Sequence, residues 1–286
     1  MKLTQRLAIG YIQTKFKLIS VISKRKTAEK AFKLFCTPQI KVKTNRLPVN
    51  AEQINFNFNR PNPAKKQIII RGYRWNHPRP HKVLILHGFG SAAHKFEHYV
   101  SPLVTKGYEV LAFDAPAHGK SGGTTINAVE YSAMIRKVLE LYGPVKGFLA
   151  HSFGGMALSL ALENTKQEAD TRIVLIAPAT ETVSAIDAAF RMLKLNDTEV
   201  RKEFDDIIFA LNEHPAAWYS IRRAVRHINA KLLWVHDEDD RITPLSDALK
   251  VKEDNHTNID FLITKGLGHQ KIYRDNEIKK QVVDFL

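Results

Sequence analysis

Apolar residues follow two different periods in the first quarter of the chain. Between residues 3 and 23 they recur every three or four positions with lysines and arginines between them, which predicts an amphipathic helix. A second helix is predicted over residues 27–35, ending before Pro38. Residues 40–75 favour antiparallel strands, because 54–58 alternate apolar and polar positions and 67–75 are rich in β-forming residues.

From Lys82 onward, short apolar runs alternate with longer segments of helical period. The predicted strands cover residues 83–86, 110–113, 145–151, 173–176, 232–235 and 259–264. The predicted helices cover 91–106, 127–141, 154–164 and 246–252, and a last helix starts near 276. This alternation predicts an α/β fold, with a mainly parallel central sheet and helices on both faces. Right-handed crossovers bring the carboxyl ends of the strands to one edge, where sheets of this kind place their sites.

Residues 180–229 interrupt the alternation with three helical segments and no strand, at 182–195, 197–211 and 216–227. We interpret this stretch as a helical cap inserted into the α/β domain. The predicted organisation is a basic helical extension over residues 1–39 and a single α/β domain over 40–286 that carries the cap. Five apolar cap residues are candidates to line an acyl pocket, or equally to attach the cap to the body: Phe190, Met192, Phe209, Trp218 and Tyr219.

The net charge of +14 is concentrated near the start of the chain. Residues 1–82 contain 19 Lys and Arg against Glu29 and Glu52, whereas the remainder has a small negative balance. A basic amphipathic helix either lies on an anionic membrane surface or packs on the body with its lysines in solvent, and both readings stay open. No recognised nucleic-acid module accompanies the charge, so nucleic acid is not an expected partner.

Cysteine usage and hydropathy bear on location. Cys36 is the only cysteine, so no intramolecular disulfide can form. No apolar run approaches the roughly 20 residues that a membrane span needs. We therefore expect a cytoplasmic protein, either free or peripheral at a membrane.

Ser152 lies at the end of the third strand of the alternating region, in the segment Ala150-His-Ser-Phe-Gly154. Small residues two positions away on either side are what a serine needs on a tight strand-to-helix turn, because larger side chains would collide there. The segment therefore predicts a nucleophile elbow, with Ala150 standing where the usual pattern has Gly.

Four other loops at strand ends extend this pattern, and together they resemble the α/β-hydrolase superfamily, in its serine hydrolase branch with a helical cap. The resemblance covers residues 82–286. The matching segments are His87-Gly-Phe-Gly90, Asp114-Ala-Pro-Ala-His-Gly-Lys-Ser121, Ala150-His-Ser-Phe-Gly-Gly155, His236-Asp-Glu-Asp-Asp-Arg-Ile-Thr-Pro244 and Gly266-Leu-Gly-His269.

The resemblance assigns the chemical roles. In the family the order along the chain is serine, acid, histidine, which implies Ser152 as nucleophile and His269 as its base. The acid usually stands three to four residues before a proline, which implies Asp240, with Asp237 as the next candidate. The backbone N–H groups of Phe89 and Phe153 would form the oxyanion hole.

The expected activity is hydrolysis of a carboxylic ester or thioester through a seryl acyl-enzyme, with a small-molecule ester as substrate. Neither a cofactor nor a metal is expected, because no nucleotide-binding motif and no ligand spacing appear. Two alternatives stay open. One is a non-catalytic or slow-turnover ligand-binding or signalling protein on the same fold. The other is a lipid esterase or acyltransferase that works at a membrane surface.

Overall fold

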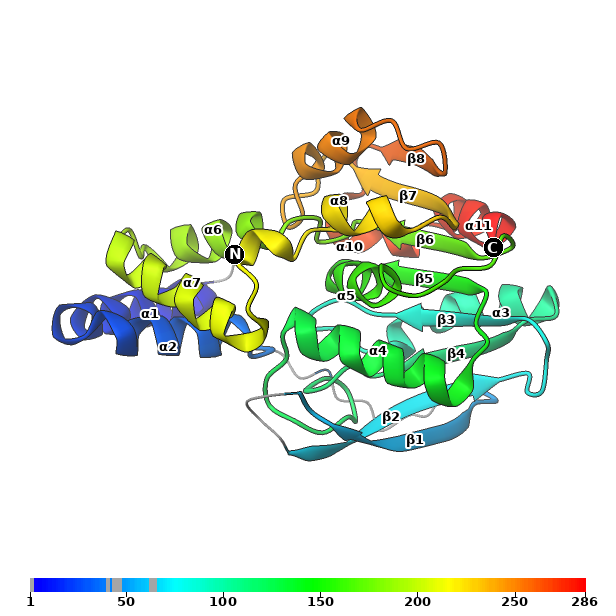
Figure 1. Ribbon diagram of the computed structural model, residues 1–286, viewed down its shortest axis with the longest axis horizontal. Coiled ribbons are helices and arrows are strands. Elements are labelled where there is room, and N and C mark those ends of the chain that lie inside the picture. Colours follow the sequence, from blue (N-terminus) through cyan, green and yellow to red (C-terminus); the bar gives the residue numbers. More distant parts are fainter. Residues whose placement is uncertain (1–2, 40–41, 43–47, 62–65) are drawn as a thin grey trace. The chain divides into compact units, whose positions relative to one another are not determined.

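The computed structural model describes residues 3–39, 42, 48–61 and 66–286, with side chains from residue 9 onward. Part of the region predicted to form strands, residues 40, 41, 43–47 and 62–65, lies outside the described residues. The chain divides into two compact units. One contains residues 1–37 and 181–219, and the other contains residues 38–180 and 220–286 (Figure 1).

An eight-stranded sheet runs through the larger unit in the order β1-β2-β4-β3-β5-β6-β7-β8. The first two strands are antiparallel and β2 pairs antiparallel with β4, whereas all pairs from β4 to β8 are parallel. The strands are β1 (Glu52–Asn59), β2 (Gln67–Trp75), β3 (Lys82–Leu86), β4 (Glu109–Phe113), β5 (Gly147–His151), β6 (Arg172–Ile176), β7 (Lys231–Asp237) and β8 (Ile259–Thr264). The predicted α/β fold is confirmed.

Helices cover both faces of this sheet (Figure 1). On one face, α3 and α11 pack over the central strands, where Tyr99, Leu103 and Val282 are buried against Val83 and Leu149. The helices α4, α5, α8 and α9 cover the other face, each in contact with the next. Their bounds are α3 (Glu97–Thr105), α4 (Ala128–Tyr142), α5 (Phe153–Leu162), α8 (Ile221–Ala224), α9 (Leu245–Glu253) and α11 (Asn276–Phe285). Burial on both faces explains why the central strands are continuous apolar runs.

The predictions erred mainly where a helix is short. The predicted helix over 216–227 is three pieces, η2 (Ala216–Trp218), α8 and η3 (Val225–His227). The predicted helix over 91–106 starts with a separate turn, η1 (Ala93–Phe96). Two further short turns, α10 (Gly268–Lys271) and η4 (Ile272–Arg274), follow β8 and were not predicted. Segments of three or four residues are too short to show a helical period.

The smaller unit is helical and joins two distant parts of the sequence. It contains α1 (Leu3–Ile22), α2 (Lys24–Phe35), α6 (Thr182–Leu193) and α7 (Thr198–Asn212). The buried Phe204 of α7 meets the rings of Phe32 and Phe35 of α2 edge-on, with centroids 5.6 and 6.0 Å away. Arg25 of α2 forms an ion pair with Glu203 of α7.

The prediction treated residues 1–39 as a separate extension and the cap as residues 180–229. The structure instead groups the basic helices with the cap segment and returns the chain to the sheet unit at Ser220. The chain leaves the sheet unit after Thr180 and returns to it at Ser220. These two points are adjacent, because the Ile221 N–H donates a hydrogen bond to the Thr180 carbonyl at 2.8 Å.

Candidate active site

Ser152 lies between the end of β5 and the start of α5, with φ 55° and ψ −123°. A non-glycine residue rarely adopts a positive φ, so the backbone here is strained. Three backbone hydrogen bonds hold the strained residue in place. Its N–H donates to the Ile176 carbonyl, and its own carbonyl accepts from Gly155 and Ala179. The tight turn of a nucleophile elbow is therefore present.

Small side chains around the turn are required by close packing. A Cβ atom on Gly154 would lie 2.7 Å from the His87 carbonyl oxygen, and one on Gly88 would lie 2.8 Å from the Ser152 Cβ. Ala150 is fully buried at the first small position of the motif. Its methyl group therefore fits where the usual pattern has glycine.

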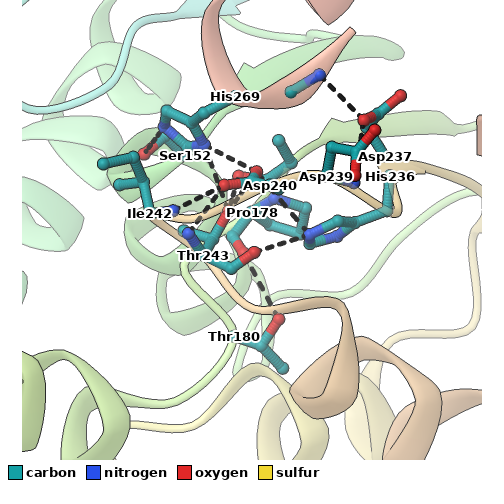
Figure 2. A network of polar contacts seen from close by, with 12 residues as sticks. Ser152, Pro178, Thr180, His236, Asp237, Asp239, Asp240, Ile242, Thr243 and His269 are labelled. Atoms are coloured by element: carbon teal, nitrogen blue, oxygen red, sulfur yellow. Dashed lines mark hydrogen bonds and ion pairs between the residues drawn. The ribbon is translucent and has the colours of Figure 1, made fainter. Parts of the chain in front are cut away.

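His269 connects Ser152 to Asp240, as Figure 2 shows. Its Nε2 atom lies 3.0 Å from Ser152 Oγ, and its Nδ1 atom lies 2.8 Å from Asp240 Oδ2. Ser152 and Asp240 are 7% and 6% exposed, so the contacts are largely shielded from water. The three residues predicted as nucleophile, acid and base are thus brought together, although they lie up to 117 positions apart in the chain.

Asp240 is held as a carboxylate. Its Oδ1 accepts the backbone N–H groups of Ile242 and Thr243, and its Oδ2 accepts from His269 and from the Thr243 hydroxyl. Burial alone would raise the pKa of Asp240. The hydrogen bonds and positive charge of His269 and the Thr243 donors outweigh burial and lower the pKa to about 2. An anionic Asp240 can orient the imidazole and stabilise its protonated form.

Asp237, the alternative acid, does not contact His269 through its carboxylate and instead fixes the loop before it. Its oxygens accept the backbone N–H groups of Leu267 and Gly268 and the Thr264 hydroxyl. Asp237 is fully buried, so its carboxylate belongs to the packed interior and does not lie in solvent. Burial tends to raise the pKa of Asp237, but these hydrogen bonds lower it overall.

The predicted oxyanion donors lie on two fixed turns. Phe153 is the first residue of α5, so its N–H has no partner within the helix. The loop that carries Phe89 is fixed by two histidines. His118 Nε2 accepts the Gly90 N–H at 2.9 Å, and His87 Nε2 accepts the Ala115 N–H at 3.0 Å. Both rings must be neutral to accept these bonds, and burial lowers the pKa of His87 to about 4.

Two residues that bear on the site were not predicted to do so. The Thr243 hydroxyl lies 2.7 Å from Asp240 Oδ2 and 3.1 Å from His269 Nδ1. His151 donates from Nε2 to the main-chain carbonyl of His269 at 3.1 Å, and its ring lies 4.8 Å from the His269 ring. The sequence predicted no role for His151 at the site. Its position beside the nucleophile was the signal in the sequence, but its partner could not be read from it.

The five apolar cap residues lie in the helical unit and divide into two groups. Phe190 and Tyr219 are buried, and Phe190 meets Phe204 edge-on at 5.1 Å, so packing within the unit accounts for them. Met192 and Phe209 are 52% and 51% exposed, and Trp218 is stacked on His214. Their role in a substrate pocket stays a prediction.

Comparison with known proteins gives a family model that matches part of the chain and a set of similar structures. The family model described as serine aminopeptidase, S33, matches residues 77–203, a range that includes Ser152 but ends before Asp240 and His269. An esterase from Pyrococcus furiosus is similar in structure, with a TM-score of 0.63 and 19% identity over 87% of this chain and 95% of that one.

Two further structures are also similar. Mouse alpha/beta hydrolase domain-containing protein 10 has a TM-score of 0.56 and 14% identity, over 81% of this chain and 96% of that one. The alpha/beta hydrolase GrgF from Penicillium has a TM-score of 0.57 and 17% identity, over 82% of this chain and 97% of that one. At these identities the structures establish the fold alone.

Proposed function

We propose that this chain, which has the α/β-hydrolase fold, is a serine hydrolase that cleaves carboxylic esters or thioesters through a seryl acyl-enzyme. The observation that carries the proposal is the continuous hydrogen-bonded path from Asp240 through His269 to the Ser152 hydroxyl. A serine hydroxyl is almost fully protonated at neutral pH and needs such a base to become nucleophilic.

The chemistry takes two steps. Ser152 Oγ attacks the ester carbonyl while its proton passes to His269 Nε2, and the oxygen that gains charge lies near the N–H groups of Phe89 and Phe153. The C–O bond to the alcohol breaks, His269 returns the proton to the leaving oxygen, and the acyl group stays on Ser152. A water molecule, deprotonated by His269, then attacks the acyl group and releases the acid and free Ser152. For a thioester the leaving atom is sulfur.

Apolar surface beside the nucleophile supports an uncharged acyl substrate. Phe89 is 40% exposed, although it is a large aromatic residue, and its ring meets Phe153 edge-on at 5.9 Å. The same two residues carry the proposed oxyanion donors. A carbonyl oxygen bound there would therefore bring its acyl group close to aromatic side chains.

Aminopeptidase activity is the second candidate, favoured by the description of the family model. Such an enzyme needs an anionic side chain to bind the α-ammonium group of its substrate. The acidic run 237–240 next to the triad is already engaged: Asp237 and Asp240 bind loop N–H groups, Asp239 accepts the Gly266 N–H, and Glu238 pairs with Lys265. This favours the ester over the peptide.

Labelling with a fluorophosphonate probe and a substrate panel test the proposal. The probe should label Ser152, and Ser152→Ala should lose both labelling and turnover, while Ser159→Ala on the same helix should retain both. The panel pairs p-nitrophenyl esters of increasing acyl length with amino acid p-nitroanilides. Faster turnover of the anilides would favour the aminopeptidase. A wild-type protein that neither reacts with the probe nor turns over any substrate would overturn both and favour a ligand-binding protein.

A further inference from the structure

Helix α1 has an apolar face that no other described element covers. Phe16, on the inner side, is 5% exposed, and Gln13 on the same side donates to the Met192 carbonyl of α6. On the outer side, Tyr11, Leu18 and Ile22 are 70%, 65% and 81% exposed. At 100° per residue these three lie within about 40° of one another around the helix axis. They therefore form a stripe, which Val21, at 83% exposed, widens at its end.

Unpaired lysines accompany this stripe. Lys15 and Lys17 of α1 are exposed, as are Lys26, Lys30 and Lys33, which follow one another at four- and three-residue spacing along α2. None of these five forms an ion pair with an acid among the described residues. Residues 1–37 contain nine Lys and Arg in total but only one acid, Glu29.

The basic side chains of α2 that face α7 form ion pairs, unlike the five lysines above. Lys24 pairs with Asp197 and Arg25 pairs with Glu203, both acids belonging to the cap segment. Internal packing thus neutralises the inner positive charges and leaves the outer ones available. The unpaired charge coincides with the uncovered apolar stripe on the same pair of helices.

We propose that the outer face of α1, with the lysines of α1 and α2, binds the surface of a membrane rich in anionic lipids. The apolar stripe would enter the boundary between headgroups and acyl chains, and the lysines would contact the headgroup phosphates and carboxylates. Among the described residues no helix is long and apolar enough to cross a membrane. The proposal does not depend on the proposed function.

Two other occupants fit the face less well. A nucleic acid would use the lysines but would leave the aliphatic stripe in water. A second copy of the chain would cover the stripe but would bring two sets of unpaired lysines together, and like charges repel. An anionic lipid surface satisfies both features at once.

Vesicle binding of the full chain tests the proposal. The protein should sediment with phosphatidylcholine vesicles that contain about 30% phosphatidylserine, which makes the surface acidic. It should bind pure phosphatidylcholine vesicles at least about tenfold more weakly. Lys15→Gln/Lys17→Gln should weaken binding to the acidic vesicles by roughly tenfold or more, because each lysine near the surface contributes on the order of 1 kcal/mol. Leu18→Glu/Ile22→Glu should weaken it at least as much.

Matched substitutions in the sheet unit provide controls. Lys166→Gln/Lys252→Gln removes two exposed lysines, and Leu141→Glu/Leu249→Glu changes two exposed leucines, without touching α1. Neither should alter vesicle binding, and every variant should keep its helical circular dichroism signal. Equal binding to both vesicle types, or no binding to either, would overturn the proposal. A dimer in sedimentation equilibrium that becomes a monomer in Leu18→Glu/Ile22→Glu would also overturn the proposal, because the stripe would then bind a second copy of the chain.

Discussion

His151, the residue before Ser152, donates a hydrogen bond from Nε2 to the main-chain carbonyl of His269 over 3.1 Å. The ring of His151 is buried, and burial together with the nearby positive charge of His269 lowers its pKa to about 3. It is therefore neutral at physiological pH and can donate only one N–H. The turn at Ser152 thus holds His269 through the main chain as well as through the Ser152 hydroxyl.

This contact predicts that His151 is a positioning residue. His151→Phe keeps an aromatic ring against His269 but removes the donor, so kcat on a soluble ester should fall roughly tenfold with KM little changed, because His269 is held less firmly. His151→Gln retains an N–H donor and should recover part of the loss. A purely structural role would lower the unfolding midpoint of both variants equally without this kinetic difference, and that result would contradict the prediction.

Substitution of the two candidate acids, Asp240 and Asp237, should affect kcat to different extents. Asp240→Asn removes the charge that His269 Nδ1 faces and allows the wrong tautomer, so kcat should fall by a factor on the order of 10⁴, the size known for such a change in a serine triad. Asp237→Asn leaves that contact intact and weakens the hold on Leu267 and Gly268. Its effect should be mainly on stability, with kcat reduced at most about tenfold.

Steady-state kinetics and thermal melts on both variants check this prediction. Fluorophosphonate labelling should slow sharply for Asp240→Asn and little for Asp237→Asn, since the probe reports the nucleophile directly. If Asp237→Asn lost more activity than Asp240→Asn at equal stability, the acid would be wrongly assigned.

The sheet and the triad could be predicted because their signals are local. Each strand of the parallel region is a short apolar run. Ser152, Asp240 and His269 lie one, three and five residues after the ends of β5, β7 and β8, in loops that resemble those of the α/β-hydrolases. The choice between Asp237 and Asp240 needed coordinates, since both lie beside the same strand end. The difference is which carboxylate reaches the imidazole and which reaches the loop N–H groups.

The association of the basic helices with the cap segment could not be predicted for a different reason. An amphipathic pattern tells which side of a helix is apolar but not what covers it. The contact of Phe32 and Phe35 with Phe204 joins residues about 170 positions apart. The sequence left open whether the lysines of α1 lie in solvent or on a membrane, and the structure adds that the outer stripe is exposed.

Gly88 should be intolerant of any side chain. A Cβ atom there would lie 2.8 Å from the Ser152 Cβ, closer than such atoms approach, and 3.0 Å from His151 Nδ1, which is tighter than most Cβ contacts. Gly88→Ala should therefore move the turn that carries Phe89 or displace Ser152, and a shift near 1 Å can cost about 100-fold in kcat. Gly10→Ala, where a Cβ would meet nothing within 4 Å, is the matched control and should leave kcat unchanged. Equal kinetics for the two variants would argue against the proposed oxyanion turn.

The buried histidines predict that stability falls as the solution becomes acidic. The pKa of His87 is lowered to about 4 and that of His151 to about 3, chiefly by burial, and burial also lowers the pKa of His236. In the unfolded chain each returns to about 6.5. Between these values the unfolded chain binds more protons than the folded chain, so the free energy of unfolding decreases as pH drops below about 6.5. Asp240 adds to the loss only below about 3.8, because its folded pKa is about 2.

At pH 5 each of His87 and His151 should remove roughly 2 kcal/mol relative to pH 8, since one pKa unit corresponds to about 1.4 kcal/mol. Urea unfolding followed by tryptophan fluorescence at pH 8, 6.5 and 5 measures this loss. His151→Gln removes one buried imidazole and should reduce the difference between pH 8 and pH 5, whereas His227→Gln, which removes an exposed one, should leave it unchanged. A midpoint that stays constant from pH 8 to pH 5 would mean that these rings take up protons in the folded chain, and the hydrogen bond that His87 accepts from the Ala115 N–H would then not hold.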